Sequence, residues 1–254
     1  MGPLTDERPK CLLKIAGLPL IEHTIENLRS IGCDKIFVVT GYKGFLIDLP
    51  NINRIENPDF MSNNILHSLM HAREVMEGEL VVAYSDIWVE PWIYSQLLDS
   101  SGDIVVSADT DWQGYYDGRT DHPISEAENV MFDADNHVVQ IGKHLDPNDG
   151  HSKPLGEFLG LWKMSPEGTE KFRSTFLNLD SRLGPDDPFQ RAKKWRQTYI
   201  TDLLQEIVDQ GSDVSCTLIE KGWAELDTRQ DFERLTEIAE RQRLSTILAY
   251  EGAI

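Results

Sequence analysis

Apolar runs alternate with amphipathic segments along the first half of the chain. The runs at residues 35–42, 81–86 and 103–108 are rich in β-branched side chains, which is typical of strands buried on both faces of a sheet. The segments at residues 19–31 and 62–76 carry apolar side chains at helical spacing. Because strands joined through helices run parallel with right-handed crossovers, this alternation predicts an α/β fold with a mostly parallel central sheet.

The second half of the chain mixes strands with further helices. Alternating apolar residues at 130–141 indicate a hairpin closed at residues 133–136. Residues 146–153 are expected to form a surface loop, and the apolar run at residues 154–164 predicts a strand that buries Glu157. Further elements are expected as a helix from residue 165, a helix at 198–210, a strand at 213–219 and a long helix at 229–250.

Composition narrows the class of protein. With 254 residues, of which 40% are hydrophobic, the chain can form one substantial core, and we expect a single domain over residues 1–254. The net charge of -19 argues against nucleic acid as a partner, because a duplex would be repelled. The sequence has no apolar run long enough for a membrane span and no export signal, and its three cysteines lack metal-binding spacing. We therefore expect a cytoplasmic protein with reduced thiols.

Two aspartates are candidate metal ligands. Asp86 lies at the end of a predicted buried strand, and ligands bind at the carboxyl ends of strands in open α/β sheets. Asp227 lies in the segment GWAELDTRQDF, where Glu225 and Asp227 would project from the same side of an extended chain. Each aspartate has a structural alternative, since Asp86 could belong to a turn and Asp227 could cap the following helix.

The amino-terminal segment carries a specific motif. Residues 5–21, TDERPKCLLKIAGLPLI, resemble the second half of the signature of the sugar-phosphate and phosphocholine nucleotidylyltransferases, T-x-x-x-P-K-x-L followed by G-x-P-L-I. Without this context, Lys10 would be either an exposed surface residue or a point charge for phosphates. The first half of the signature, an opening strand and a Gly-rich loop that cradles the triphosphate, is absent, and the comparison predicts a truncation of about 10 to 20 residues.

The resemblance extends over nearly the whole chain. It implies a Rossmann-like, three-layer α/β/α nucleotidyltransferase fold. It also places Asp86 and Asp227 where the family holds its two metal-binding aspartates, and so implies Mg²⁺ as the cofactor. Lys10 would neutralise the charge that gathers on the phosphates during transfer. Glu225 is a further candidate ligand.

A third matching segment lies at the start of the predicted helix at residues 62–76. There Asn63, Asn64 and Ser68 are similar to the residues that phosphocholine-type cytidylyltransferases place beside the base and ribose of the nucleotide. Amides suit that task because one side chain both donates and accepts hydrogen bonds. Helix capping is the alternative role for the two asparagines, and Ser62 is the expected N-cap.

Residues 109–122 form a polar loop rich in aromatic and charged side chains, and acceptor-binding insertions are expected around residues 109–164. Aromatic faces and carboxylates can hold an ammonium group, and an arginine can bind a phosphate through two hydrogen bonds. The loop resembles that of cytidylyltransferases acting on phosphocholine and small phosphonates. The candidate acceptor-binding residues are Asp109, Trp112, Tyr115, Arg119, His122 and Glu157. Alternatively, the aromatic residues cover the core and Glu157 forms a structural ion pair.

Together, these features predict a Mg-dependent cytidylyltransferase that transfers CMP from CTP to a small phosphonate or phospho-alcohol and releases pyrophosphate. The acceptor would be of the 2-aminoethylphosphonate, 2-hydroxyethylphosphonate or phosphocholine type. The alternatives are a sugar- or polyol-1-phosphate nucleotidylyltransferase and a catalytically impaired nucleotide-binding module. A homodimer, or a fusion to another catalytic domain, is compatible with the resemblance.

Overall fold

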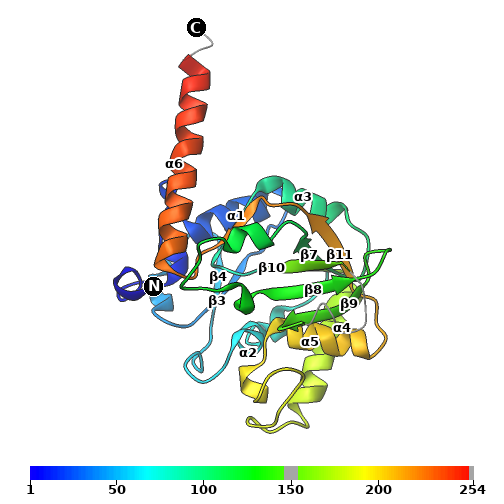
Figure 1. Ribbon diagram of the computed structural model, residues 1–254. Helices are drawn as coiled ribbons and strands as arrows, with labels where there is room; N and C mark the ends of the chain where they lie inside the picture. Colours follow the sequence, from blue (N-terminus) through cyan, green and yellow to red (C-terminus); the bar gives the residue numbers. More distant parts are fainter. Residues whose placement is uncertain (146–153, 252–254) are drawn as a thin grey trace.

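A mixed six-stranded sheet lies at the centre of the protein (Figure 1). The computed structural model describes residues 1–145 and 154–251, with side chains described through residue 240. The surface loop expected at residues 146–153 lies outside the described residues. The strand order is β11-β7-β10-β8-β9, and β5 also pairs with β10. These strands are β5 (Leu80–Ala83), β7 (Ile104–Asp109), β8 (Glu128–Phe132), β9 (Val138–Lys143), β10 (Leu155–Met164) and β11 (Ser215–Ile219).

The strand directions show how far the sheet is parallel. β5, β7 and β8 each run antiparallel to β10, β11 runs parallel to β7, and β9 runs antiparallel to β8. Four of the six described strands therefore share one direction, as expected, but β10 runs against its three neighbours. An apolar run identifies a buried strand without giving its direction, so the orientation of β10 could not be read from the sequence.

β10 is buried from Gly156 to Met164 and changes its pairing register with β7 near Gly160. Gly160 has a φ of 76°, and a Cβ atom there would lie 2.3 Å from Cδ2 of Tyr84. Only glycine allows this backbone conformation and this close contact together. The bulge therefore lets the Tyr84 ring pack directly on the backbone of β10.

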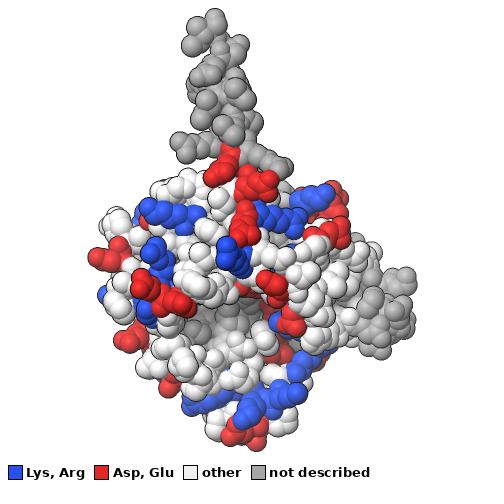
Figure 2. Space-filling view, turned by 60° about the vertical axis from the view of Figure 1, so that its left-hand side comes forward, with Lys and Arg blue, Asp and Glu red and all other residues white. Residues whose placement is uncertain are grey.

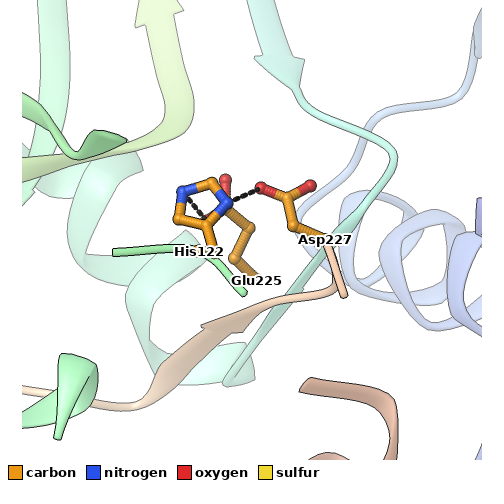
Figure 3. A group of neighbouring side chains, drawn as sticks. All are labelled: His122, Glu225 and Asp227. Carbon is orange, nitrogen blue, oxygen red and sulfur yellow. Dashed lines mark ion pairs between the residues drawn. The ribbon is translucent and has the colours of Figure 1, made fainter. Parts of the chain in front are cut away.

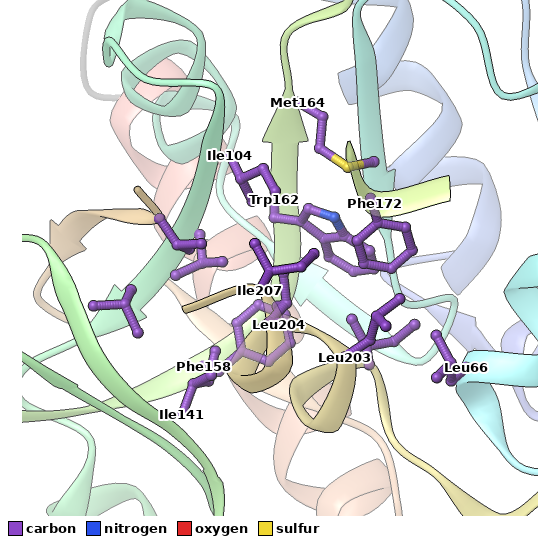
Figure 4. Close-up of a cluster of buried hydrophobic side chains, with 14 of the residues drawn as sticks. Leu66, Ile104, Ile141, Phe158, Trp162, Met164, Phe172, Leu203, Leu204 and Ile207 are labelled. Carbon is purple, nitrogen blue, oxygen red and sulfur yellow. The ribbon is translucent and has the colours of Figure 1, made fainter. Parts of the chain in front are cut away.

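Helices cover both faces of the sheet. On one face, α4 (Pro166–Asp180) and α5 (Ile200–Asp209) pack against the fully buried Trp162 (Figure 4). On the other face, α3 (Pro91–Asp99) packs near Leu161. Because successive residues of a strand point to opposite faces, β10 contributes to both cores. This arrangement is the three-layer α/β/α architecture that the resemblance implied.

The apolar run around Asp86 forms the strand predicted before Asp86 and a further short strand after it. β5 ends before a turn that contains Asp86, and β6 (Ile87–Val89) begins directly after it. β6 pairs antiparallel with β12 (Trp223–Glu225), and the Leu226 amide donates a hydrogen bond of 2.8 Å to the Asp86 carbonyl. This pairing brings the segment after β12 to the turn at Asp86.

The amino-terminal part forms two small sheets beside the main one (Figure 1). β1 (Lys14–Ile15) pairs with β2 (Leu18–Pro19), and α1 (Leu20–Ser30) follows at once. β3 (Phe37–Thr40) runs parallel to β4 (Asn53–Glu56). The helix predicted at residues 19–31 and the strand predicted at residues 35–42 are therefore confirmed with shorter bounds, but β3 is only partly buried.

The next helix, α2 (Ile65–Met70), is shorter than predicted and begins later. Its N-cap is Asn64, whose side chain accepts a hydrogen bond of 2.9 Å from the Ile65 amide. The expected cap, Ser62, instead donates to the Asp59 carbonyl. The Asn64 main chain donates to the carbonyl of Arg196, and this distant contact holds the preceding residues outside the helix.

The final helix, α6 (Arg229–Glu251), projects away from the sheet (Figure 1). Among the helices that the structure describes, none combines the length and apolarity needed to cross a bilayer. On the face shown in Figure 2, acidic and basic side chains are interspersed, and acidic ones lie beside a central hollow. With a net charge of -19, the protein attracts cations over a long range.

Candidate active site

Lys10 joins two aspartates that are far apart in the sequence. Its Nζ atom lies 2.7 Å from Oδ2 of Asp86 and 2.5 Å from Oδ1 of Asp227. Lys10 opens a short 3₁₀ turn after Pro9, whereas the aspartates lie in the turn before β6 and just after β12. The pairing of β6 with β12 therefore assembles the cluster. Three side chains that the sequence analysis identified in separate motifs meet at one point.

Opposite charges stabilise one another in this cluster. Burial opposes the charge on Lys10, but the carboxylates of Asp86 and Asp227 outweigh it and raise the pKa of the ammonium above its usual value. Burial also opposes ionisation of Asp227, yet a hydrogen bond from His122 and the charge of Lys10 hold the pKa of Asp227 well below its usual range. Lys10 and Asp227 are therefore both charged at neutral pH.

His122 and Glu225 lie beside Asp227 (Figure 3). Nδ1 of His122 lies 3.0 Å from Oδ2 of Asp227, and its Nε2 lies 3.8 Å from Oε2 of Glu225. Burial and the nearby carboxylates of Asp227 and Asp86 raise the pKa of Glu225 well above its usual value. Burial thus disfavours the ionised form of Glu225, and a positive charge that entered the cluster would favour it.

The donor set fits a hard divalent cation. One ligand atom from each of His122, Glu225 and Asp227 lies within 4.8 Å of the other two. Oδ2 of Asp86 and Oδ1 of Asp227 both contact the single ammonium of Lys10, so a positive charge already lies between them. Carboxylate oxygens crowded around one position are the ligands that hard cations prefer. Asp227 belongs both to the group with His122 and Glu225 and to the pair of aspartates that contact Lys10. It is therefore the central residue of the candidate metal site.

A pocket of about 290 Å³ opens beside Asp86 and Asp227. Its walls carry Glu128 on β8, Lys143 at the end of β9 and Glu157 on β10. A pocket of this size, lined by aromatic rings and a few charged groups, accepts a small molecule. The aromatic lining residues that the structure describes include Tyr84, Tyr116, Tyr199 and Trp223.

Two carboxyl groups in this pocket are buried. Burial raises the pKa of Glu157 to about 8, although the Tyr116 hydroxyl donates a hydrogen bond to it and Arg119 is near. Burial raises the pKa of Glu128 to about 7, against the opposing charge of Lys143. A ligand that brings a positive charge into the pocket would favour the ionised form of both carboxyl groups.

Arg119 is not available as a phosphate ligand, which corrects the prediction from the sequence. Its Nε atom lies 2.8 Å from Oδ1 of Asp231, and both side chains are almost completely buried. The guanidinium also lies 3.5 Å from Oε2 of Glu225 and 4.7 and 4.8 Å from the ring centroids of Tyr115 and Tyr116. The loop folds back onto the start of α6, so the arginine is neutralised inside the protein.

Three further residues of the predicted acceptor loop are structural. Asp109 is buried and accepts a hydrogen bond of 2.8 Å from the Trp223 indole. Trp112 is buried in a small apolar cluster, and the Tyr115 hydroxyl donates to the Glu225 carbonyl and accepts from its amide. None of the three is among the described residues that line the pocket. Here the alternative is correct, because the aromatic residues cover the core and hold β12 in place.

The other two predicted acceptor residues, His122 and Glu157, do line the pocket. They reach it from different elements, since His122 lies in the loop before β8 and Glu157 lies on β10. Their contact with an acceptor stays a prediction. Glu157 accepts a hydrogen bond from the Tyr116 hydroxyl. Its partner is therefore a hydroxyl group and not the charged group of the structural ion pair that was its alternative role.

The residues predicted beside the nucleotide gather at the start of α2. The side-chain amides of Asn57 and Asn63 exchange hydrogen bonds of 3.0 and 3.2 Å, and Asn57 also donates to the Ser68 hydroxyl at 3.0 Å. Asn64 caps α2 and lines the pocket. Capping is therefore confirmed for Asn64, and contact of these side chains with a nucleotide stays a prediction.

Four pocket residues were not predicted from the sequence: Tyr84, Tyr116, Glu128 and Lys143. A partial signal was present for two of them, because Glu128 and Lys143 lie just outside the two ends of the hairpin predicted at residues 130–141, and the structure pairs them directly opposite each other. No such signal existed for the tyrosines, whose positions depend on the turn after β5 and on the folding of the aromatic loop.

Comparison with known proteins places the chain in a family. The pattern of the MobA-like NTP transferase domain matches residues 1–144, which is more than half of the chain. The chain belongs to the MobA-like NTP transferase family. This membership confirms the resemblance identified from the motifs and makes the protein a nucleotidyltransferase.

Several characterised relatives are cytidylyltransferases. The CTP:phosphoglutamine cytidylyltransferase of Campylobacter jejuni is 23% identical over 91% of this chain and 92% of its own length. The 2-aminoethylphosphonate cytidylyltransferase of Lancefieldella rimae is 32% identical over 34% of this chain and 38% of its own. A bifunctional IPC transferase and DIPP synthase of Rubrobacter xylanophilus is 31% identical over 91% of this chain, but the match spans only 47% of that longer protein.

Solved structures share the fold. The inositol-1-phosphate CTP transferase from T. maritima superposes with a TM-score of 0.65 at 18% identity, covering 93% of this chain and 90% of that one. The CTP:phosphocholine cytidylyltransferase from Streptococcus pneumoniae gives a TM-score of 0.67 at 19% identity, covering 94% and 92%. These similarities confirm the α/β nucleotidyltransferase fold.

Proposed function

We propose that the protein is a Mg²⁺-dependent cytidylyltransferase that transfers CMP from CTP to a small phosphonate or phosphorylated alcohol and releases pyrophosphate. The observation that carries this proposal is the meeting of Lys10, Asp86 and Asp227 beside a small pocket. The cytidylyltransferases among its relatives support CTP as the donor. A module without catalysis would not need this charged cluster intact.

The pocket favours an acceptor with a positively charged end. Carboxylates outnumber basic side chains in its lining, and Lys143 is already paired with Glu126 at 3.1 Å. An ammonium beside Glu128 and Glu157, and near the faces of tyrosines, is stabilised by both kinds of group. Among the three acceptor types, 2-aminoethylphosphonate and phosphocholine therefore fit better than the uncharged alcohol of 2-hydroxyethylphosphonate.

The reaction would be a direct displacement. An oxygen of the acceptor attacks the α-phosphorus of CTP in line, and the bond from that phosphorus to pyrophosphate breaks. When bound by Asp86 and Asp227, Mg²⁺ supplies charge neutralisation for the phosphate oxygens. Lys10 is protonated in the cluster because Asp86 and Asp227 raise its pKa, so it brings a positive charge that can stabilise the leaving group. Glu128 and Glu157 hold the far end of the acceptor and thereby orient its attacking oxygen.

A polyol-1-phosphate acceptor is the second candidate. The relative from Rubrobacter xylanophilus, named for IPC transfer, is 31% identical over 91% of this chain. Hydroxyl groups of a polyol would find hydrogen-bond partners in Tyr116, Tyr199 and Glu157, which line the pocket. The excess of carboxylates in the pocket favours the cationic acceptor over this one.

A substrate panel tests the proposal directly. Pyrophosphate release is measured with CTP, UTP, GTP and ATP, each combined with 2-aminoethylphosphonate, phosphocholine, 2-hydroxyethylphosphonate, inositol-1-phosphate and glucose-1-phosphate. Each reaction is run with Mg²⁺ and with excess chelator. We expect turnover with CTP, with Mg²⁺ and with a cationic acceptor, at least about 100-fold above the uncharged acceptors in kcat/KM, because a desolvated ion pair contributes roughly 3 kcal/mol.

The other outcomes separate the alternatives. A preference for inositol-1-phosphate would replace the proposed acceptor class by the polyol class. If calorimetry detects CTP binding while no combination releases pyrophosphate, the protein is a catalytically impaired nucleotide-binding module. Turnover that persists in excess chelator would refute the metal assignment.

A further inference from the structure

One buried carboxyl oxygen in the pocket beside Asp86 lacks a hydrogen-bond partner. Glu157 lines this pocket and is only 3% exposed, and the Tyr116 hydroxyl donates a hydrogen bond to its Oε1 atom. Its Oε2 atom is buried and has no hydrogen-bond partner among the residues that the structure describes. Because a buried oxygen without a partner costs free energy, a ligand that brings a hydrogen-bond donor to Oε2 gains affinity.

Glu128, the other buried carboxyl group of the pocket, is already paired. Its Oε1 atom accepts a hydrogen bond of 3.2 Å from the Thr201 hydroxyl, and its Oε2 atom accepts one of 3.3 Å from the Tyr84 hydroxyl. The two carboxyl groups therefore differ although both are buried. Glu128 can contribute negative charge to the pocket, whereas Glu157 also offers an oxygen that is free to accept a hydrogen bond.

Two aromatic rings of the pocket already hold a cation of the protein. The guanidinium carbon of Arg119 lies 4.8 Å from the ring centroid of Tyr116, and Nζ of Lys143 lies 4.8 Å from the ring centroid of Tyr199. A ring attracts a cation through the negative charge density of its face, and a second cation at the same ring is repelled by the first. These two rings therefore gain little from a further cation.

Two other rings of the lining pack against the protein. The Trp223 ring stacks on Tyr115, with centroids 5.8 Å apart and an angle of 25° between the ring planes. The Tyr84 ring lies against the backbone of β10 at Gly160 and forms a T-shaped pair with Phe158 at 6.0 Å. The described rings therefore border the pocket, but each has a face or an edge committed to a contact inside the protein.

The form of an ammonium group decides which of these features it can use. A primary ammonium has three N–H donors and can pair with the free oxygen of Glu157. A quaternary ammonium carries the same charge but has no N–H, and proteins bind it mainly between open aromatic faces. Here an oxygen is free and the rings are engaged, so the pocket suits the primary group.

We propose that Glu157 determines the acceptor specificity, and that the acceptor carries a primary ammonium rather than a quaternary one. This specificity rests on the proposed cytidylyltransferase function and separates its two cationic acceptors, because 2-aminoethylphosphonate has N–H donors and phosphocholine has none. An N–H of the bound ammonium donates to Oε2 of Glu157, while the Tyr116 hydroxyl holds Oε1 and fixes the orientation of the carboxylate. Full N-methylation removes this hydrogen bond and leaves Oε2 buried without a partner.

A series of acceptors that differ only in N-methylation tests the proposal. The series is 2-aminoethylphosphonate and its N-methyl, N,N-dimethyl and N,N,N-trimethyl derivatives, which share one ammonium charge while the number of N–H donors falls from three to none. Calorimetry measures their affinity with Mg²⁺ and a CTP analogue that has a methylene bridge between the α- and β-phosphorus, so that no transfer occurs. We expect the trimethyl compound to bind at least about 30-fold more weakly than the primary amine, with the largest single loss at the last methyl group.

Glu157→Gln separates the hydrogen bond from the size of the added methyl groups. The substitution keeps the shape of the side chain but removes the charge that strengthens the hydrogen bond, so the affinity ratio across the series should fall by about tenfold. Glu170→Gln alters an exposed glutamate paired with Arg173 and should keep the full ratio. Circular dichroism of both variants checks that the fold is retained.

Equal or tighter binding of the trimethyl compound would overturn the proposal and indicate a site for quaternary ammonium among the rings. The same ratio in the unmodified protein and in Glu157→Gln would also overturn it, because size and not the N–H would then decide. Binding of none of the four compounds would have the same consequence. Failure of the cytidylyltransferase function would look different, since the series would bind in the expected order while CTP and 2-aminoethylphosphonate released no pyrophosphate.

Discussion

Two pairs of carboxyl groups share one pocket but differ in their surroundings. In the outer pair, Asp86 and Asp227 have side chains that are 26% and 21% exposed, and both contact the ammonium of Lys10. In the inner pair, Glu128 and Glu157, burial raises the pKa values to about 7 and about 8. Near neutral pH the pocket therefore combines an ionised aspartate at its outer side with carboxyl groups that titrate inside it.

This difference shows that the surroundings of a carboxyl group, more than its residue type, determine which kind of ligand it binds. The outer pair keeps contact with water and lies within reach of a single cation, which suits metal ions and phosphates. The inner pair lies among tyrosines and has lost most of its hydration, so it binds tightly only a ligand that brings positive charge. The same separation of two kinds of carboxyl group underlies acid–base assignments in many enzymes.

The largest expected effect follows from breaking the outer pair. Asp86→Asn and Asp227→Asn each keep the side-chain shape but remove a charge that would hold Mg²⁺, and kcat should fall by at least about 10³-fold. Pyrophosphate release at saturating substrates measures this loss. Asp186→Asn, which changes an exposed aspartate paired with Lys194, is the matched control and should retain full activity. Full turnover in either active-site variant would remove the metal assignment.

Replacing Arg119, which lies behind the outer pair, tests whether the loop at residues 109–122 has a structural role. Arg119→Met leaves Asp231 buried without its ion pair, so we expect unfolding to require about 3–5 kcal/mol less free energy. Urea denaturation measures the change. Arg229→Met removes an exposed pair with Glu233 and should cost less than about 0.5 kcal/mol. If Arg119→Met leaves the stability unchanged and raises only the KM for the acceptor, the result would support the phosphate contact predicted from the sequence.

The inner pair should make stability depend on pH. The pKa of Glu157 rises from 4.5 to about 8 on folding because of burial, so between these values the folded state binds more protons than the unfolded state. Its contribution is fully present below about pH 4.5 and is lost as pH rises towards 8. Glu157→Gln should flatten this profile, with a difference of about 3 kcal/mol between pH 5 and pH 8.5. Parallel profiles for the two proteins would contradict the burial of an ionisable group.

The smallest effect concerns acceptor selectivity. Glu157→Gln should raise KM for 2-aminoethylphosphonate by about tenfold, because it removes one charge from the site of the ammonium. The KM for 2-hydroxyethylphosphonate should change less than about threefold. Glu170→Gln, which alters an exposed glutamate paired with Arg173, is the control and should affect neither. Equal effects on both acceptors would mean that Glu157 does not contact the charged end.

Most elements of the fold were predictable from local patterns. The β8–β9 hairpin and the strands β7 and β10 lie close to where apolar alternation and apolar runs placed them. The start of α2 was predicted wrongly, because Asn64 is held by Arg196, a contact that no local pattern contains. The strand that ends near Asp86 was predicted, whereas β6 was not, because it forms only by turning away to pair with β12.

The candidate site was only partly predictable. Lys10, Asp86 and Asp227 were identified because each lies in a motif whose chemistry follows from residue type. The aromatic loop was misjudged because composition reveals the charge of Arg119 but not its partner, Asp231, which lies on α6. Glu128 was missed because it lies outside the predicted hairpin, and its place in the pocket depends on how the neighbouring strands enclose it.

By itself, the sequence determined which side chains could do phosphate and metal chemistry and which segments would form helices and strands, since both depend on residue type and local spacing. Only the tertiary structure decided which of these side chains meet. The hydrogen bond between Lys10 and Asp227 spans 217 positions, and the pairing of β6 with β12 makes it possible. Contacts of that span depend on how whole layers pack, so burial, charge pairing and the division between outer and inner carboxyl groups appear only in the folded protein.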